Sequence, residues 1–376
     1  MESPLYLPHG EVASAKLDRN HLLSEALETI VRDYPPQDSY GQPLKGLWNG
    51  PTSIAYLFLH VAAARPELLV ASRPARHWAQ AYLGGTRDPE AMVLEPSARC
   101  GISSEVLAWQ AVRASLSGDP AHVAAFLSHV PAVVDGPAEA EWHSGRAGML
   151  YLLRMICHWV PESAPLLQEA TALVRGKIVA EGPDWEFKGQ RYIGAVHGDI
   201  GTLTQVALSG PTVDEKKKLQ QWLARLLDWQ KQDGNWPVNE QVDPRPYVQF
   251  CHGAPGFVQS LKSIRPLFPE LDDEISRAIT LGNELVWREG LLKKEPNLCH
   301  GAFGNCLTLP PTQRDVFLEL ATPRSVAEAR LQDEAHFEKA NYGWEFSLLT
   351  GYWPGAAWAW LVGEEPEARF IGYNDV

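Results

Sequence analysis

Cysteine and histidine residues that stand directly before glycines carry the clearest chemistry in this chain. We single out His197-Gly198, Cys251-His252-Gly253 and Cys299-His300-Gly301, in each of which the glycine is followed by an apolar stretch. Thiolate and imidazole are the ligands that zinc prefers, and two cysteines with one histidine leave a fourth tetrahedral position open, as in catalytic zinc sites. Such a soft ligand set also suits a site that holds a substrate thiolate.

Spacing alone does not show that the two Cys-His pairs share a metal. Cys251 and Cys299 are 48 residues apart, which is not the spacing of a zinc finger. The pairs can bind one ion only if the fold brings them together. At this point all four side chains (Cys251, His252, Cys299 and His300) are candidate ligands.

A repeat that runs along the whole chain explains how the two Cys-His pairs could lie close together in the fold. A short glycine-centred turn followed by an apolar stretch occurs seven times, with leading glycines Gly50, Gly101, Gly145, Gly198, Gly253, Gly301 and Gly351. Their successive separations are 51, 44, 53, 55, 48 and 50 residues. A fixed period of this size is the signature of a repeat architecture. Equivalent turns of neighbouring units would therefore place both Cys-His pairs side by side.

Between the turns the sequence predicts helices of two kinds. Segments such as 23–34, 219–227 and 275–286 carry apolar residues at i, i+3, i+4 and i+7, which predicts amphipathic helices. Segments after the turns, such as 149–156, are more evenly apolar. We therefore expect an all-α (α/α) toroid of seven inner and seven outer helices. It forms one domain over residues 1–376, in which residues 1–40 hold an N-terminal segment and the first outer helix.

Composition excludes several other classes of protein. The net charge of −13 argues against nucleic acid as the main partner, because phosphate binding needs concentrated Lys and Arg. We find no uncharged apolar run long enough for a transmembrane helix and no signal peptide, so we expect a cytoplasmic protein. The five cysteines are an odd number without a secretory signal, which favours reduced thiols. Cys157 and Cys306 are expected in the core, and Cys100 is a weaker candidate for lining the mouth of the ring.

The turns resemble those of the lanthionine synthetase C-like (LanC-like) family, and in particular its eukaryotic members. The resemblance rests on the turns GAVHGDIG, FCHGAPG and LCHGAFGN, and on SGRAGMLYLL, WEFKGQRYIGAVHG, GNWP, GLLKK and the late ARF. It covers roughly the full chain. The family fold is a toroid of seven inner and seven outer helices, in agreement with the repeat.

The resemblance also implies a ligand set and a reaction. It selects Cys251, Cys299 and His300 as the ligands of one zinc ion and leaves His252 out. In bacterial members the zinc activates a peptide cysteine that adds to dehydroalanine or dehydrobutyrine, and in eukaryotic members the thiol is glutathione, added to dehydrated proteins. His197, on the neighbouring turn, suits the general acid that protonates the α-carbon after thiol attack.

The same resemblance proposes two residues for binding glutathione. Lys294 matches a family position that holds a glutathione carboxylate, and Arg369, in the ARF match, is a weaker candidate for the same task. Three turns depart from the family pattern: the second reads CGISSEVL, the first reads NGPTS, and the seventh has Pro354 in place of glycine. We expect these departures to affect the shape of the mouth and leave the zinc ligands in place.

Two other hypotheses about the function remain open from the sequence. The first is a non-catalytic scaffold that binds zinc and glutathione and recruits protein partners, since the same ligands would serve it. The second is another toroid enzyme, a prenyltransferase subunit or a glycosidase. A prenyltransferase needs an Asp beside its Cys and His, and a glycosidase needs two carboxylates facing one pocket, whereas the turns offer only Asp199.

Overall fold

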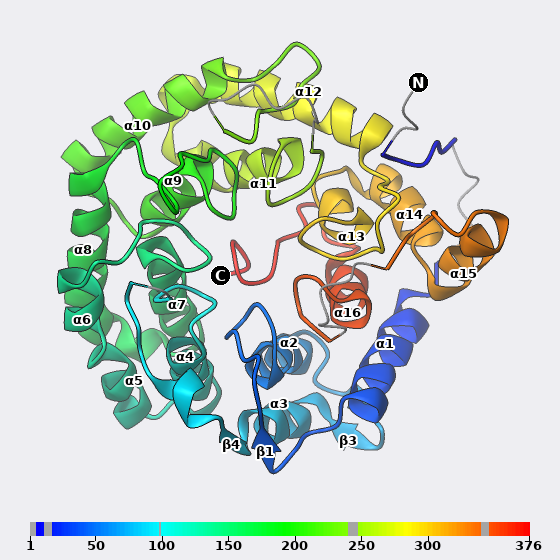
Figure 1. Ribbon diagram of the computed structural model, residues 1–376, viewed down its shortest axis with the longest axis horizontal. Helices are drawn as coiled ribbons and strands as arrows, with labels where there is room; N and C mark the ends of the chain where they lie inside the picture. Colours follow the sequence, from blue (N-terminus) through cyan, green and yellow to red (C-terminus); the bar gives the residue numbers. More distant parts are fainter. Residues whose placement is uncertain (1–4, 11–16, 98, 240–246, 340–345) are drawn as a thin grey trace.

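A computed structural model gives the fold, and it describes residues 5–10, 17–97, 99–239, 247–339 and 346–376. The helices form two concentric rings, one inside the other (Figure 1). This arrangement confirms the expected helical toroid. Among the described residues, no helix is both long enough and apolar enough to span a bilayer.

The inner ring is built from the helices that follow the glycine turns. They are α2 (Pro51–Ala64), α4 (Glu105–Ser117), α7 (Arg146–Trp159), α9 (Asp199–Leu208), α11 (Ala254–Ile264), α13 (Ala302–Cys306) and α16 (Tyr352–Val362). Six of the seven begin at the residue after the leading glycine. The exception is α4, which begins four residues after Gly101 because the second turn is longer. Most of the residues in these helices are buried, as their even apolar character predicts.

The outer ring holds the amphipathic helices. They are α1 (Arg19–Asp33), α3 (Ala75–Leu83), α5 (Pro120–Leu127), α6 (Val130–Asp135), α8 (Ala164–Glu181), α10 (Val213–Asp228), α12 (Asp272–Glu289), α14 (Pro311–Leu320) and α15 (Pro323–Gln332). The periodic apolar residues of α10, for example, are the ones it buries: Leu219, Leu223 and Leu226. Two of the seven repeat units have two short outer helices in place of one long helix: α5 with α6, and α14 with α15 (Figure 1).

The ring closes between the two ends of the chain. The first outer helix, α1, packs against the last inner helix, α16 (Figure 1). Arg19 at the start of α1 forms an ion pair with Asp315 of α14. Each other inner helix packs against the outer helix that follows it in the sequence, as α2 does with α3 and α11 with α12. Closure therefore needs the first outer helix, which lies within residues 1–40.

Strands and 3-10 helices are short and lie in the connections. Strand β1 (Ser39–Tyr40) pairs in parallel with β4 (Thr86–Arg87), and β2 (Leu69–Val70) pairs antiparallel with β3 (Arg73–Pro74). The 3-10 helices are Pro89–Met92, Pro161–Ser163, Arg265–Leu267 and Pro269–Leu271. None of these short elements replaces a helix of either ring.

Glycine is required at the turn that precedes α11. Gly253 has φ +108°, in the region that only glycine adopts readily, and a Cβ there would collide with the carbonyl oxygen of Tyr247 and with Asn235 Oδ1. Asn235 uses its amide to fix this turn: Nδ2 donates to Tyr247 O (3.1 Å), and Oδ1 accepts from the Ala254 backbone N–H (2.8 Å). The first N–H of α11 has no partner within the helix, and the Asn235 side chain accepts its hydrogen bond instead.

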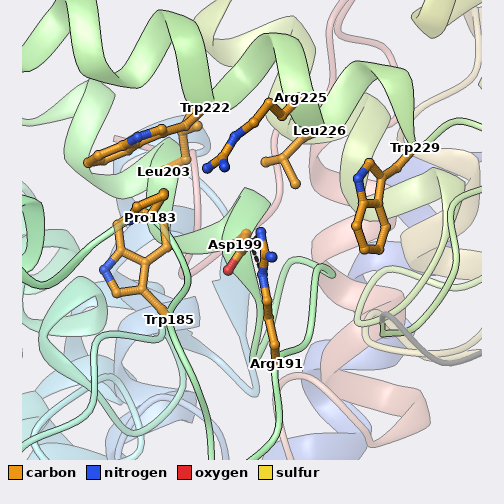
Figure 2. A pocket seen from close by; sticks show the side chains of 9 residues that line it. All are labelled: Pro183, Trp185, Arg191, Asp199, Leu203, Trp222, Arg225, Leu226 and Trp229. Carbon is orange, nitrogen blue, oxygen red and sulfur yellow. Dashed lines mark hydrogen bonds and ion pairs between the residues drawn. The ribbon is translucent and has the colours of Figure 1, made fainter.

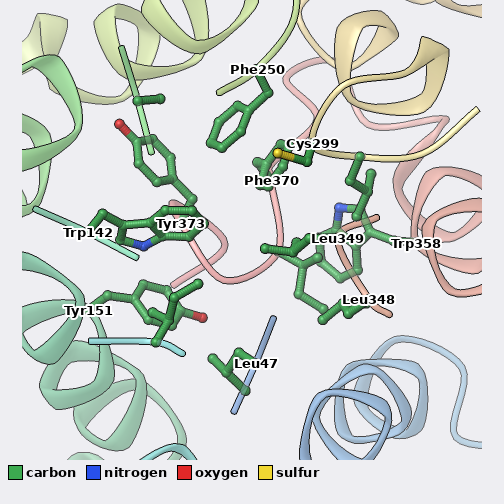
Figure 3. Close-up of a cluster of buried hydrophobic side chains, with 14 of the residues drawn as sticks. Leu47, Trp142, Tyr151, Phe250, Cys299, Leu348, Leu349, Trp358, Phe370 and Tyr373 are labelled. Atoms are coloured by element: carbon green, nitrogen blue, oxygen red, sulfur yellow. The ribbon is translucent and has the colours of Figure 1, made fainter. Parts of the chain in front are cut away.

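The C-terminal segment fills the centre of the ring beneath the turns. Phe370 stacks on Phe250 with ring centroids 3.6 Å apart, and Trp142 Nε1 donates to the carbonyl of Gly372 (3.0 Å) (Figure 3). Asp375 is buried and accepts hydrogen bonds from the hydroxyls of Tyr56 (2.7 Å) and Tyr151 (3.0 Å). Because Phe250 directly precedes Cys251, the stacking of Phe370 on Phe250 also holds the fifth turn in place.

Candidate metal site where the turns meet

The seven turns contact one another around the ring, which is what brings distant residues together. Backbone hydrogen bonds join the first turn to the second (Leu47 N to Ile102 O), the second to the third (Cys100 N to Ser144 O), the fifth to the sixth (Cys251 N to Cys299 O) and the sixth to the seventh (Cys299 N to Leu349 O). The seventh returns to the first, since Ser347 Oγ donates to Trp48 O. These bonds join five of the seven neighbouring pairs of turns. Glu141 and His197 join the third turn to the fourth, and Gly194 of the fourth lies against the carbonyl of Cys251 in the fifth, so the turns form a continuous rim.

Three side chains of the fifth and sixth turns converge, and we call Cys251, Cys299 and His300 the thiolate cluster. Their ligand atoms all lie within 4.8 Å of one another, and all three residues are buried. The backbone bond from Cys251 to the Cys299 carbonyl, 3.2 Å long, holds the two cysteines in register. His300 is fixed from its own backbone, because its N–H donates to Asn297 Oδ1 (2.9 Å).

The donor set fits a zinc ion. Two sulfurs about 2.3 Å from a tetrahedral zinc lie about 3.8 Å apart, so the observed spacing needs little adjustment. The pKa of Cys251 is lowered well below that of a free thiol because Cys299 donates a hydrogen bond to its sulfur and His252 and His300 favour negative charge there. Within the described residues the group has three protein donors, which leaves one tetrahedral position for a substrate.

His252 lies next to the thiolate cluster but is not a member of the donor group. Its imidazole acts on Cys251 through charge, and its ring lies beside Tyr192 and Tyr247, with centroids 5.8 Å and 6.3 Å away. The geometry therefore groups the same three residues that the family resemblance selects.

Lys294 is connected to the thiolate cluster through one side chain. Its Nζ donates to Gln249 Oε1 (2.9 Å), and Gln249 Nε2 donates to Cys251 Sγ (3.1 Å). The ammonium also lies over the ring of Tyr247 at 5.6 Å. The segment before it is held by the N-terminus, since Lys293 N donates to Leu5 O (3.0 Å). Lys294 is thus a cation near the expected metal, held by Gln249 and Tyr247.

His197 lies on the fourth turn and pairs with a buried carboxylate that the sequence analysis did not identify. Its Nδ1 lies 3.1 Å from Glu141 Oε2, and the two side chains are 24% and 2% exposed. A carboxylate can only accept, so Nδ1 carries the proton and Nε2 is the nitrogen left for chemistry. Phe187 stacks on the imidazole with centroids 4.1 Å apart and fixes its plane.

His143 was missed as well, and it lies against the same pair. The backbone N–H of His143 donates to Glu141 Oε2 (2.6 Å), and that of Ser144 donates to Oε1. The ring of His143 lies 5.3 Å from that of His197, and burial lowers its pKa well below the usual value. We call Glu141, His143 and His197 the carboxylate–imidazole cluster; their ligand atoms also lie within 4.8 Å of one another.

The sequence did contain a signal for these two residues. The third turn reads EWHSGRAG, which places Glu141 and His143 just before the leading Gly145. His197, His252 and His300 stand directly before their glycines, whereas His143 stands two residues before Gly145. The signal in the sequence is therefore any titratable residue within a turn, and not only one next to the glycine.

Asp199, the carboxylate at the start of α9, lines a pocket of about 140 Å³ between α9 and α10 (Figure 2). Arg191 binds one of its oxygens through Nε (3.0 Å) and Nη2 (2.8 Å). Burial nevertheless raises the pKa of Asp199 to about 7. Among the described residues that line this pocket Asp199 is the one carboxylate, whereas a glycosidase needs two that face one pocket.

Arg369 is placed differently from the other predicted residues. It donates to the backbone carbonyl of Asp375 (3.2 Å), and its charge acts on Glu365 and on His158 near the end of α7. Among the described contacts, none joins Arg369 to the thiolate cluster. Its role in binding glutathione stays a prediction that the observed contacts do not favour.

The remaining cysteines are separate from the metal site. Cys100 and Cys306 are fully buried, and burial raises the pKa of each thiol to about 12. Cys157 is partly buried in α7 and packs against the core. All five thiols are free. The expectation that Cys306 is a core residue is confirmed, whereas Cys157 is only partly buried at the edge of the core; Cys100 is fully buried and does not line the mouth.

Comparison with known proteins identifies the family. The family model of lanthionine synthetase C-like proteins matches residues 46–345, so the chain belongs to this family. A zebrafish (Danio rerio) protein named glutathione S-transferase LANCL1 is 28% identical over 200 residues, which cover 46% of this chain and 47% of that protein. The match thus spans about half the length of that relative.

A solved structure shows the same fold. Nisin cyclase superimposes with a TM-score of 0.57 over 92% of this chain and 94% of its own, at 11% sequence identity. At this identity the likeness concerns the fold alone. It agrees with the two rings described above.

Proposed function

We propose that this protein is a zinc-dependent enzyme that adds the thiol of glutathione to dehydroalanine or dehydrobutyrine residues in proteins or peptides. The observation that carries the proposal is the buried thiolate cluster, with two sulfurs and one nitrogen converging and a fourth position left for a thiol. Family membership supports thioether chemistry, and the name of the zebrafish relative supports glutathione as the thiol.

Cys251, Cys299 and His300 would hold the zinc. When bound, the ion would keep the glutathione thiol deprotonated at neutral pH and so supply the nucleophile. Gln249 would orient Cys251 through its hydrogen bond to Sγ, in the way that outer-shell partners orient metal ligands. Lys294 would hold a carboxylate of glutathione, since its ammonium is a compact, flexible point charge.

The reaction is a net addition, in which a C–S bond forms at the β-carbon and a proton is added at the α-carbon. His197 would carry that proton at Nε2, taking it from the incoming thiol and giving it to the α-carbon. Glu141 keeps Nδ1 protonated and would stabilise the imidazolium while the proton is held. Nothing is oxidised, and no group leaves.

The mouth has features that suit a peptide substrate. Aromatic rings of Phe187, Tyr192 and Tyr247 lie beside His197, His252 and Lys294 respectively. Such rings offer apolar surface to a peptide and shield the reacting atoms from water. A cytoplasmic location, where glutathione is abundant, is part of the same proposal.

The test is direct. The zinc-loaded protein is incubated with glutathione and a dehydrobutyrine-containing peptide, and the products are measured by mass spectrometry. We expect a glutathione adduct that depends on Cys299 and His197 and is unaffected in a Cys157→Ala control. If the zinc is present but no adduct forms above the uncatalysed rate, the protein is instead a scaffold that binds zinc and glutathione.

A further inference from the structure

The carboxylate–imidazole cluster has the composition of a metal site in its own right. It combines one buried carboxylate with two imidazoles, and all three ligand atoms lie within 4.8 Å of one another. Two histidines and a glutamate are a known ligand set of catalytic zinc. We propose that Glu141, His143 and His197 bind a second zinc ion, separate from the one expected at the thiolate cluster.

The spacing of the donors supports the proposal. Two ligands about 2.1 Å from a tetrahedral zinc lie about 3.4 Å apart. His197 Nδ1 and Glu141 Oε2 are already 3.1 Å apart, so an ion could replace the proton that lies between them and bind both atoms with little movement of either residue. The proton would be released to solvent, as it is whenever a metal replaces a proton on its ligand. His143 reaches the same point from the third turn, and its ring contacts that of His197 edge to face.

The surrounding residues hold these donors in place, as outer-shell partners do in metal sites. The two oxygens of Glu141 accept from the backbone N–H groups of His143 and Ser144, which fixes the carboxylate. The hydroxyl of Ser144 lies 2.8 Å from Nδ1 of His143, which leaves Nε2 of that ring for an ion. Phe187 stacks on His197 and restricts its rotation.

The same surroundings predict that this site is the weaker of the two. Its donors are nitrogen and oxygen, whereas the thiolate cluster offers two sulfurs, which zinc binds more strongly. Lys45, Arg99 and Lys188 lie close enough to lower the pKa of His143, and their charges also oppose a bound cation. The thiolate cluster should therefore fill first, and the second ion should bind only when zinc is in excess.

Binding there has a consequence that rests on the proposed function. The second ion would occupy the pair formed by Glu141 and His197, which the addition reaction uses to carry its proton. Excess zinc should then inhibit addition. The carboxylate–imidazole cluster would act as an inhibitory metal site built around the proton carrier.

The first experiment measures zinc content and does not depend on activity. The full chain is dialysed against increasing zinc, and bound metal is measured by mass spectrometry. We expect about one ion per chain at limiting zinc and about two in excess. His143→Asn should lose only the second ion, because Asn can keep the contact with Ser144 but is a poor zinc ligand. His77→Asn, at an exposed histidine of α3, should bind the same number of ions as wild type.

Two results would overturn the proposal. One is a wild-type protein that never exceeds one ion, and the other is a second ion that persists in His143→Asn. Retention of the first ion and an unchanged melting temperature would show that the variant is folded. If His143→Asn does not fold, His143→Gln takes its place.

Cobalt gives an independent readout in the wild-type protein. Co²⁺ at the thiolate cluster should show a sulfur-to-metal charge-transfer band, whereas a second equivalent bound by nitrogen and oxygen should add d–d bands alone. An increase of the charge-transfer band with the second equivalent would count against the proposal.

Activity assays separate this inference from the proposed function. If addition is catalysed, excess zinc should inhibit wild type and spare His143→Asn, and equal inhibition of both would remove the inhibitory role. If no addition is seen but the second ion binds through His143, the proposed function fails and the metal site stands.

Discussion

Two clusters on the same rim, built from equivalent turns, contain different donors. The thiolate cluster joins the fifth and sixth turns through sulfur and imidazole, and the carboxylate–imidazole cluster joins the third and fourth through oxygen and imidazole. Tyr192 lies between them, with its ring near both His197 and His252. The comparison teaches that the contact between neighbouring turns brings side chains together in both places, while the residue types decide whether a cluster suits a metal ion or a proton carrier.

Removal of a sulfur ligand should have the largest effect. We expect Cys299→Ala to weaken zinc binding by more than about 100-fold and to abolish addition, because one of the two sulfurs that would bind the ion directly is lost. Metal analysis and the adduct assay check this. Cys157→Ala, at a thiol outside both clusters, should behave as wild type; equal zinc loss in both variants would contradict the assignment.

Removal of the proton carrier should separate the two clusters. We expect His197→Asn to slow addition by about 100- to 10,000-fold while the zinc of the thiolate cluster stays bound, because general acid–base catalysis contributes a factor of this size. The measurement is the rate of adduct formation with zinc content determined on the same sample. If zinc is lost together with the rate, the two clusters are not independent.

Lys294 should affect binding more than chemistry. We expect Lys294→Gln to raise the KM for glutathione about 10-fold, equivalent to about 1.4 kcal/mol, with a smaller change in kcat. A γ-glutamyl-free thiol such as cysteamine, which lacks carboxylates, should show no such change. A similar loss with both thiols would mean that Lys294 acts through Gln249 on the metal ligand and not on glutathione.

Asp199 should give the smallest effect, visible in stability. Its pKa is about 7 in the folded protein and about 3.9 when unfolded, so the folded state binds the extra proton between these values. The stability that this proton provides is therefore present at pH 4 and is lost as the pH rises through 7. Denaturant unfolding of wild type and Asp199→Asn should show that wild type loses more stability over this range. Parallel pH profiles would contradict the raised pKa.

Much of the fold could be predicted because it depends on a repeated local pattern. The glycine spacing and the alternation of amphipathic with evenly apolar segments are local properties. They predicted seven inner helices and a first outer helix within residues 1–40, which the structure places at Arg19–Asp33. The division of two outer positions into two short helices each was not predicted. In both places a proline stands near the break, at Pro131 and Pro323, and it removes a backbone donor.

The sequence by itself determined which residue types stand on which turns, and with the repeat it determined that the fifth and sixth turns are neighbours. From the residues alone it left four possible ligands, and only the family resemblance reduced them to three. It also could not place Arg369, which the C-terminal segment directs toward Asp375.

The tertiary structure decided what the side chains meet. It paired Glu141 with His197 across two turns and placed His143 beside them, and it linked Lys294 to Cys251 through Gln249. The physical reason is that the direction of a side chain on a turn is set by contacts with the neighbouring turn. Those contacts join residues about fifty positions apart, and no local pattern in the chain records them.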